Sequence, residues 1–332
     1  MSQILLSYGS GGKLTHQLIR EIFIRYFDNP ILSQMNDSAV FSINGKVAFT
    51  TDSYIVTPIF FPGGDIGELA INGTVNDLSM MGAKPMYISI GFIIEEGFSI
   101  EDLERIAMSI KKASREAGVE VVTGDTKVVE KGKADKLFIN TSGIGIIPEG
   151  VDIRGNNAIP GDVVIVSGTI GDHGIAILSQ RKDLHFSVEI KSDTAPLNRM
   201  VEEMIKVADI HVLRDPTRGG LATTLNEIAQ SSDVGIEIYE SEIPISPPVE
   251  NACNLLGLDP LYIANEGKLI AIAPKDKASK LLEVMHKFPY GKEAKIIGEV
   301  TQEHPDIVVL HTRFGSHRIL DMLSGDPLPR IC

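Results

Sequence analysis

Two sets of side chains in this 332-residue sequence could carry out chemistry: a terminal cysteine and a series of aspartates. The last seven residues are Asp326-Pro327-Leu328-Pro329-Arg330-Ile331-Cys332. Two prolines favour an extended chain, and seven extended residues reach roughly 23 Å at ~3.3 Å each. We therefore expect Cys332 to be a thiol on a swinging arm, in a tail that is too polar and too proline-rich to belong to the core. A chain end of this kind is most often frayed, so the interpretation depends on a site that would use the thiol.

Aspartates recur next to apolar segments at five places along the chain. They lie in Asn36-Asp37-Ser38, Thr51-Asp52-Ser53, Asn76-Asp77-Leu78, Gly124-Asp125-Thr126-Lys127 and Asp215-Pro216-Thr217-Arg218-Gly219-Gly220. A single Asp in such a place usually caps a helix or forms a turn. Five in similar surroundings suggest convergence on one site, where hard oxygen ligands suit Mg²⁺ and its bridging of carboxylates to phosphates. The pattern indicates a magnesium–nucleotide site.

Other nucleotide and metal motifs fit poorly. The segment Gly9–Lys13 is followed by Leu14, so it lacks the spacing and the hydroxyl residue of a Walker A loop. The glycines of Gly168–Gly174 are spaced G-x-x-G-x-x-G, which favours a tight strand-to-helix turn over a dinucleotide site. The histidines lack zinc-site spacing, and His173 in this turn is expected to be structural. Cys253 is expected to be a buried thiol without chemistry.

Composition excludes several classes of partner. The chain carries 44 acidic and 31 basic residues, a net charge of −13, which repels nucleic acid and anionic membranes. Two cysteines indicate no disulfide framework and fit a reducing compartment. The N-terminus lacks signal-peptide features, and no apolar run reaches transmembrane length. We expect a cytoplasmic protein with neither a nucleic-acid nor a membrane partner.

Hydrophobic periodicity predicts the elements that would position these residues. The order of strand and helix patterns favours an α+β fold in both halves, with a break at Pro148–Pro160. Expected helices cover Thr15–Tyr26, 65–82, 100–117, 173–180, 197–208 and 221–231. The first of them is expected to carry Leu18, Ile19, Ile22 and Phe23 on one apolar face. Expected strands cover two arms around the Asn44-Gly45 turn within 38–57, then 87–94, 120–123, 137–147, 163–166, 235–239, 269–273 and 307–310. The predicted units are residues 1–35, an N-terminal domain 36–148, a C-terminal domain 149–310 and a terminal segment 311–332.

The aspartate motifs carry a family resemblance that spans essentially the whole chain. Together with Asn72–Pro85, they resemble the aminoimidazole ribonucleotide synthetase superfamily, which includes selenophosphate synthetase, thiamine monophosphate kinase and the HypE hydrogenase maturation factors. The Pro-Arg-Ile-Cys ending is similar to that of the HypE branch. Residues 1–35 contain no cysteine, whereas selenophosphate synthetase carries a reactive Cys or selenocysteine there. Thiamine monophosphate kinase needs no terminal thiol.

The resemblance implies an architecture and a site. The N-terminal sheet would pair with that of a second subunit in a dimeric β-barrel, and a C-terminal α+β domain would pack outside it. ATP would lie in a groove at the barrel, with the glycine-rich N-terminal segment over its phosphates. Matching positions imply Mg²⁺ ligands at Asp37, Asp52, Asp77, Asp125 and Asp215, and further nucleotide contacts at Lys13, Asn76 and Asn226.

The resemblance also implies an activity. A carbamoyl group placed on Cys332 by a HypF carbamoyltransferase would be dehydrated with ATP to a thiocyanate, the source of a cyanide ligand in nickel–iron hydrogenase. The HypC–HypD complex would be a further partner. We expect Lys127 to stabilise charge near the activated oxygen and Glu266 to be the base. The alternatives are a small-molecule kinase or synthetase of the same superfamily, and a carrier whose partner performs the chemistry.

Overall fold

The structure is a computed structural model that describes residues 3–9, 13–35, 38–181, 188–323, 325 and 330–331. Three predicted site groups lie outside the described residues: Asp37, Cys332 and the side chain of Lys13. Most of the glycine-rich segment, residues 10–12, also lies outside them.

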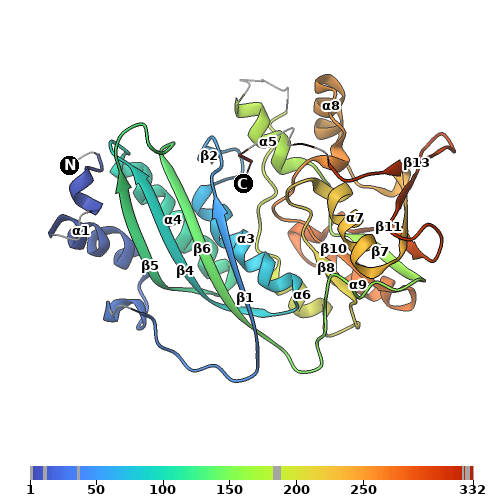
Figure 1. The fold of residues 1–332 in the computed structure, drawn as a ribbon, viewed down its shortest axis with the longest axis horizontal. Coiled ribbons are helices and arrows are strands. Elements are labelled where there is room, and N and C mark those ends of the chain that lie inside the picture. Colours follow the sequence, from blue (N-terminus) through green and yellow to red (C-terminus); the bar gives the residue numbers. More distant parts are fainter. Residues whose placement is uncertain are drawn as a thin grey trace.

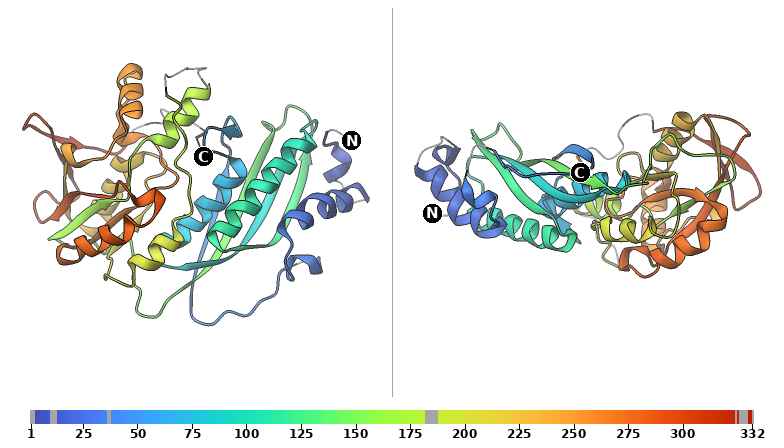
Figure 2. Two further views of the ribbon diagram at one scale, coloured as in Figure 1. Left: turned by 180° about the vertical axis from the view of Figure 1, so that it is seen from behind. Right: turned by 90° about the horizontal axis from the view of Figure 1, so that it is seen from below.

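The described chain forms two large sheets side by side (Figure 1). The first sheet has the order β1-β6-β4-β5. It consists of β1 (Lys46–Tyr54), β4 (Lys84–Glu95), β5 (Glu120–Val129) and β6 (Leu137–Ile147). Only β4 and β5 pair in parallel. Helices α3 (Ile66–Met80) and α4 (Ile100–Ala117) lie on one face of this sheet, as the two views of Figure 2 show. The short hairpin β2 (Phe60–Phe61) and β3 (Gly64–Asp65) leads into α3.

Local signals in the sequence explain where these two helices begin and end. The carboxylate of Asp65 caps α3 by accepting hydrogen bonds from the backbone of Gly67 and Glu68. The hydroxyl of Ser99 caps α4 by accepting from the backbone of Asp102, and Gly118 ends this helix in the left-handed region at φ 76°. Residues 65–82 and 100–117 were both predicted as helices, and both predictions are confirmed.

The N-terminal helix is continuous from residue 13 to residue 27 but changes pitch. It consists of α1 (Lys13–Leu18), a π-helical turn η2 (Ile19–Ile24) and α2 (Arg25–Phe27). Short 3-10 turns flank it at η1 (Leu6–Gly9) and η3 (Leu32–Gln34). Leu18, Ile22 and Phe23 are buried, so the predicted apolar face of this helix is confirmed.

The second sheet has seven strands in the order β13-β12-β9-β11-β7-β10-β8. These are β7 (Asp162–Val166), β8 (Val212–Arg214), β9 (Gly235–Tyr239), β10 (Ile270–Pro274), β11 (Lys295–Thr301), β12 (Val308–His311) and β13 (His317–Leu320). The helices are α5 (Asp172–Arg181), α6 (Asn198–Met204), α7 (Gly220–Ser232), α8 (Pro247–Leu256) and α9 (Ala278–Met285). Short 3-10 turns lie at η4 (Glu240–Glu242), η5 (Pro260–Tyr262), η6 (Lys275–Lys277) and η7 (Pro289–Gly291).

Helices cover both faces of this second sheet. Residues of α7 share one hydrophobic core with the sheet, and residues of α6 and α9 share another. Buried residues of α5 and α8 instead join the core of the first half. These two helices therefore tie the two halves of the molecule together.

The predicted hairpin around Asn44-Gly45 is wrong. Residues 38–45 form no strand, and β1 pairs along its whole length with β6 instead. The ring of Phe41 lies 4.4 Å from that of Tyr87 on β4, so this segment packs against the sheet rather than extending it. The sequence patterns also missed β8, α8, α9, β11 and β13, most of which are short.

The face of the first sheet opposite α3 and α4 carries exposed apolar side chains. Phe49 is 68% exposed, Val47 44% and Ile93 42%. Neither large sheet of the described chain closes into a barrel. The dimeric barrel therefore stays a prediction, for which this face is the surface available.

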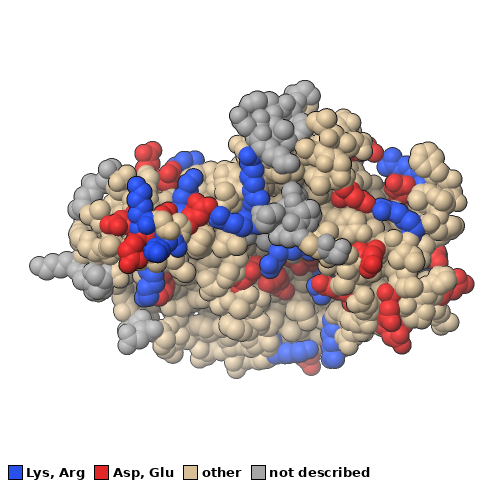
Figure 3. Space-filling view, turned by 45° about the horizontal axis from the view of Figure 1, so that its top comes forward, with Lys and Arg blue, Asp and Glu red and all other residues tan. Residues whose placement is uncertain are grey.

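Charge is distributed without a dominant sign on the face that Figure 3 shows, where acidic and basic side chains are interspersed. Among the described residues, no helix is both long enough and apolar enough to span a membrane.

Candidate functional site

A cleft of about 490 Å³ opens where the two sheets meet, and carboxylates from both halves border it. Asp77 stands on the last turns of α3, and Asp215 directly follows β8; both line the cleft. The hydroxyl of Thr50 on β1 donates to Asp77 Oδ2 at 2.8 Å. Arg214, Arg218 and Glu227 complete the charged lining, and Arg214 is paired with Glu227. The cleft thus brings together two of the predicted aspartates.

The carboxyl groups around this cleft influence one another strongly. Burial, followed by the charge of Asp215, raises the pKa of Asp77 to about 7. Burial likewise raises the pKa of Asp215, and the Asp52 carboxylate adds to the effect. Asp52 also raises the pKa of Asp77, so this third aspartate belongs to the same electrostatic cluster. Mutual repulsion of this kind favours a cation among the three carboxylates.

Glu266 lies at the buried end of this cluster. Its side chain is only 4% exposed, and its Oε1 has no hydrogen-bond partner among the described residues. Burial raises its pKa well above the usual range, and the charges of Asp215, Asp193, Asp52 and Asp77 add to the shift. A buried polar atom without a partner is rare in folded proteins, and it commonly marks a place where a ligand or catalytic partner belongs.

The backbone of Glu266 is fixed from both halves of the molecule. Its N–H donates to Asp193 Oδ1 at 3.1 Å, and its carbonyl accepts from Asn76 Nδ2 at 3.2 Å. The other oxygen of Asp193 pairs with Lys268 Nζ at 3.1 Å in a buried ion pair. Burial opposes ionisation of Asp193, but Lys268 and neighbouring donors outweigh it and hold its pKa below the usual range. An ionised Asp193 therefore anchors the Glu266 loop.

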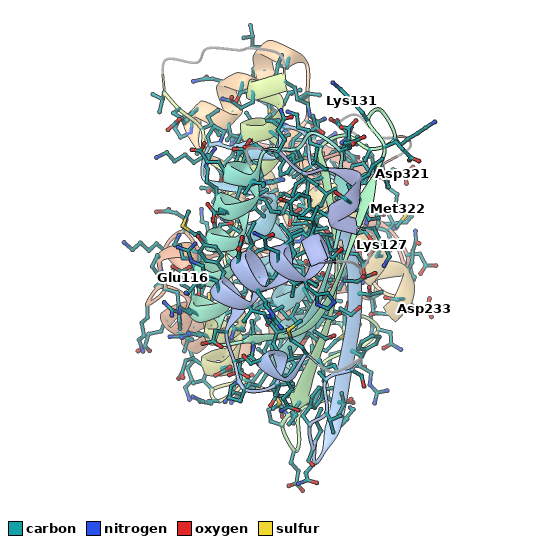
Figure 4. The ribbon with its side chains drawn as sticks, turned by 90° about the vertical axis from the view of Figure 1, so that its left-hand side faces the viewer. Glu116, Lys127, Lys131, Asp233, Asp321 and Met322 are labelled. Atoms are coloured by element: carbon teal, nitrogen blue, oxygen red, sulfur yellow. The ribbon has the colours of Figure 1, made fainter. Side chains whose placement is uncertain are left out.

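Asp125 and Lys127 lie on the other face of the first sheet. Registered pairs place Asp52, Thr141, Ile90 and Gly124 in one row across the strands, so Asp125 falls in the next row and points the opposite way. Three strand spacings of about 4.8 Å, or about 14 Å in total, also separate β1 from β5. Lys127 Nζ lies 3.0 Å from Asp125 Oδ1, and its side chain is 64% exposed. Figure 4 shows Lys127 on the strand side of the molecule, away from Glu116 on α4.

A bulge in β5 causes this orientation. Val121 pairs with Ile88, but the next residue of β4, Ser89, pairs with Thr123. Val122 is therefore an extra residue, and both Val121 and Val122 are buried. An extra residue reverses the alternation of side chains beyond it. If the same residues paired regularly, Asp125 would share the face of Asp52.

The carboxylates of the cleft suit a cation that is bound together with a nucleotide's phosphates. Within the part of the chain that the structure describes, no three His, Cys, Asp or Glu side chains are grouped closely enough to hold a metal ion. Mg²⁺ commonly uses only one or two carboxylates and completes its shell with phosphate oxygens and water. Asp77 and Asp215 fit that arrangement, and their raised pKa values show that a positive charge beside them would be favourable.

The end of the described chain is docked between the two halves, where Figure 1 marks the C-terminus near β2. Ile331 is 4% exposed and belongs to the core of the first half. Its carbonyl oxygen lies 2.7 Å from His173 Nε2. The tail was predicted to be too polar and too proline-rich to join the core. This prediction is wrong for Ile331, because its side chain packs in one core with residues of α5 and of the first half.

Comparison with known proteins identifies the family of this chain. Residues 35–147 match the family described as AIR synthase related protein, N-terminal domain, and residues 160–311 match its C-terminal domain. The carbamoyl dehydratase HypE of Cupriavidus necator is 52% identical over 99% of this chain and 95% of its own. The chain belongs to the HypE family of carbamoyl dehydratases. A crystal structure of HypE in complex with ATP superposes on this HypE-family chain with a TM-score of 0.97, at 54% identity and 99% coverage of both chains. The chain matched in a crystal structure of a HypE–HypF complex gives a TM-score of 0.82 at 51% identity, covering 92% of this chain and 99% of that one.

Two predicted nucleotide contacts, Asn76 and Asn226, make hydrogen bonds to the framework of this HypE-family protein, and their contact with a nucleotide stays a prediction. Asn76 is buried and bonds to Ala195, Leu197 and Glu266, so it braces the Glu266 loop. Asn226 is also buried, and its amide nitrogen donates to Ala222 and to Leu320 of β13. The neighbouring Glu227 lines the cleft.

Sequence reasoning missed the residues that hold Glu266. Lys268 lies two residues beyond Glu266, and a basic residue beside a candidate acid is a weak signal. Asp193 lies in a polar stretch, Glu189–Thr194, that shows no motif. Only the fold reveals its importance, because the segment between α5 and α6 carries this carboxylate to the Glu266 loop.

Proposed function

We propose that this HypE-family protein uses ATP to dehydrate a carbamoyl group carried on the thiol of its own Cys332. The product is a thiocyanate that supplies a cyanide ligand to the iron of nickel–iron hydrogenase. One observation carries the proposal: the chain end is docked beside the loop of Glu266, whose buried Oε1 lacks a hydrogen-bond partner among the described residues. A Cβ added to Gly174 would lie 3.4 Å from both Ile331 Cδ1 and the backbone nitrogen of Ala264, two residues before Glu266.

The chemistry converts a poor leaving group into a good one. In the thiocarbamate, S–C(=O)–NH₂, the carbonyl oxygen attacks the γ-phosphorus of ATP and ADP departs. Loss of one N–H proton leaves the imidate ester S–C(OPO₃)=NH. Removal of the second proton, with departure of phosphate, forms the triple bond of S–C≡N. The thiocarbamate and ATP thus give thiocyanate, ADP and phosphate, and two protons leave the nitrogen.

Glu266 is proposed as the base for these protons. Its raised pKa makes the ionised carboxylate a stronger base than an exposed glutamate. Neutralising the charges of Asp77 and Asp215 would favour that ionised form. Mg²⁺ bound with ATP would supply positive charge at the phosphates. Asp77 and Asp215 are its proposed ligands, and Asp52, Asp37 and Lys13 stay predicted contacts to the same group.

Lys127 and Asp125 require a second copy of the chain if they act at the same cleft. They lie on the exposed apolar face, away from Asp77 and Glu266. A homodimer that pairs these faces would bury Phe49 and could bring Lys127 and Asp125 to the partner's cleft. We therefore propose a homodimer with composite sites in which Lys127 stabilises charge on the transferring phosphoryl group.

The proposed partners follow the order of the chemistry. A HypF carbamoyltransferase would load the thiol, in line with the HypE–HypF complex whose matched chain is 51% identical to this one. A HypC–HypD complex would accept the cyanide. Loading of the thiol and transfer of the cyanide are both expected in the cytoplasm.

Mass spectrometry of the C-terminal peptide tests the proposal. Protein carbamoylated on Cys332 is incubated with Mg-ATP, and loss of one water from that peptide is expected. Water loss that requires no ATP, or ATP turnover without any change in the peptide, would favour the small-molecule kinase alternative. Water loss only after the partner is added would favour the carrier alternative.

A further inference from the structure

His173 is a fully buried histidine whose two ring nitrogens face different parts of the chain. It is 0% exposed on α5, and the ring of Phe61 meets it edge-on with centroids 5.6 Å apart. Nε2 lies 2.7 Å from the carbonyl oxygen of Ile331. Nδ1 lies 2.8 Å from Ser192 Oγ. The site proposed above does not use this side chain.

The contacts fix the hydrogen-bonding roles of the ring. A carbonyl oxygen can only accept, so Nε2 carries the hydrogen and donates it to Ile331. A neutral ring then accepts at Nδ1, where the hydroxyl of Ser192 donates. Burial lowers the pKa of His173, which agrees with the neutral form. The oxygen of Ser192 in turn accepts from the backbone N–H of Thr194 at 3.2 Å.

The segment Ser192–Thr194 is the same segment that holds Glu266. Asp193 accepts from the N–H of Glu266 at 3.1 Å and pairs with Lys268. The N–H of Ser192 donates to Pro62 of the first half at 2.8 Å. A continuous series of hydrogen bonds and peptide units therefore connects the carbonyl of Ile331, through His173, to the loop of Glu266.

Further contacts hold the chain end in this place. The guanidinium of Arg181 donates to the carbonyl oxygens of Arg330 and Thr57. The N–H of Thr57 also donates to the carbonyl oxygen of Arg330, at 3.2 Å. The side chain of Arg330 reaches Asp135 at 2.8 Å and the carbonyl of Ile55 at 3.1 Å. Backbone and side chain of the chain end are thus both recognised, which indicates a built dock rather than an incidental contact.

We propose that His173 is a positioning residue: it docks the chain end by its bond to Ile331 and, through Ser192–Thr194, couples docking to the placement of Glu266. The coupling rests on the function proposed above; the dock itself does not. When the chain end leaves, the buried Nε2–H loses its acceptor, so the segment that holds Glu266 loses a fixed neighbour. Glu266 is then held firmly only while the chain end that carries the modified Cys332 is docked.

Carboxypeptidase trimming tests the dock without any need for activity. The first bond cut is the Ile331–Cys332 peptide bond, whose carbonyl oxygen is the one that His173 binds. His173→Gln carries an amide near the Nε2 position and can still donate to Ile331, whereas His173→Asn reaches only toward Ser192. We expect removal of Cys332 to be about tenfold faster in His173→Asn than in wild type, and close to wild type in His173→Gln.

His286→Asn is the control, because His286 Nε2 also bonds to a backbone carbonyl, that of Ala294 at 3.0 Å, but at an exposed position away from the chain end. It should leave trimming unchanged, and equal thermal midpoints of the two His173 variants would exclude unfolding as the cause. Equal trimming of wild type and His173→Asn would overturn the dock, as would equally fast trimming of His173→Asn and His173→Gln.

Kinetics test the coupling. With carbamoylated protein, Ser192→Ala should lower the first-order rate of water loss and leave the ATP concentration at half-maximal rate unchanged. An unchanged rate in Ser192→Ala would overturn the coupling while leaving the dock intact. Absence of water loss in wild type would overturn the proposed function, and the trimming result would still stand.

Discussion

Replacing Glu266 with glutamine should abolish dehydration and should also remove a pH-dependent cost from the stability of the fold. The substitution is nearly isosteric and takes the titrating group away from a buried position. Because burial and four neighbouring carboxylates raise its pKa well above the usual range, the folded Glu266 keeps its proton at pH values where the unfolded glutamate has already lost it. The unfolded chain exposes an ordinary glutamate that is ionised at neutral pH.

The size of the effect follows from this difference in protonation. Below about pH 4 the carboxyl is protonated in both states and adds no pH dependence. Above the unfolded pKa of about 4.3, folding takes up one proton, which costs about 1.4 kcal/mol per pH unit while the folded carboxyl stays protonated. The stability of the wild type relative to Glu266→Gln should therefore fall by about 1.4 kcal/mol with each pH unit above about 4.3, until the folded carboxyl ionises. The buried amide adds a constant cost of about 1–3 kcal/mol, which shifts the difference without changing its slope.

Urea unfolding at a series of pH values measures this slope. The chain contains no tryptophan, so far-UV circular dichroism is the suitable signal. Glu149→Gln, at an exposed position, controls for the loss of a carboxyl as such. A stability difference between wild type and Glu266→Gln that stays constant from about pH 4.5 to about pH 7 would show that Glu266 is already ionised in the folded protein, and the reasoning about its burial would fail.

Three further predictions concern the cation, the dimer and the thiol. Asp77→Asn should raise the Mg²⁺ concentration needed for half-maximal ATP turnover at least about tenfold, since it removes a hard anionic ligand, while circular dichroism stays unchanged; full activity at limiting Mg²⁺ would remove the ligand role. Light scattering should give a homodimer at micromolar concentration. At limiting Mg²⁺, where Asp77→Asn should show little activity, mixing it with Lys127→Ala should restore up to about a quarter of the wild-type activity if sites are composite; no recovery from mixed dimers would place both residues' functions in one chain. Cys332→Ala should lose thiocyanate formation and keep nucleotide binding, and a variant that still acquires and dehydrates the carbamoyl group would refute the thiol's role.

Much of the site could be predicted from residue types. The rest depends on which face of the sheet each side chain points to and on which residues pair between strands. Asp52, Asp77 and Asp215 were predicted to be hard ligands beside apolar segments, and in the fold these three carboxylates influence one another electrostatically. Asp125 has the same sequence surroundings but points away, because pairing between β4 and β5 shifts by one residue. No residue in this segment predicts that shift in pairing. Likewise, Asn44-Gly45 has a strong hairpin signal, yet β1 finds its partner in the distant β6, where Asp52 meets Thr141.

The extra residue at Val122 has a consequence for comparison among relatives. Strand positions are usually matched between proteins by counting residues along the strand, because odd and even positions point to opposite faces of the sheet. The extra residue Val122 exchanges the two faces for every position that follows it in β5. A relative whose fifth strand pairs regularly must be one residue shorter before its Gly-Asp-Thr-Lys motif to present the aspartate and lysine on the same side. A relative with a one-residue gap at Val122 in the alignment would therefore keep the aspartate and the lysine on the same face of the sheet. An ungapped relative without the bulge would turn both side chains toward α3 and its carboxylates, even with an identical motif.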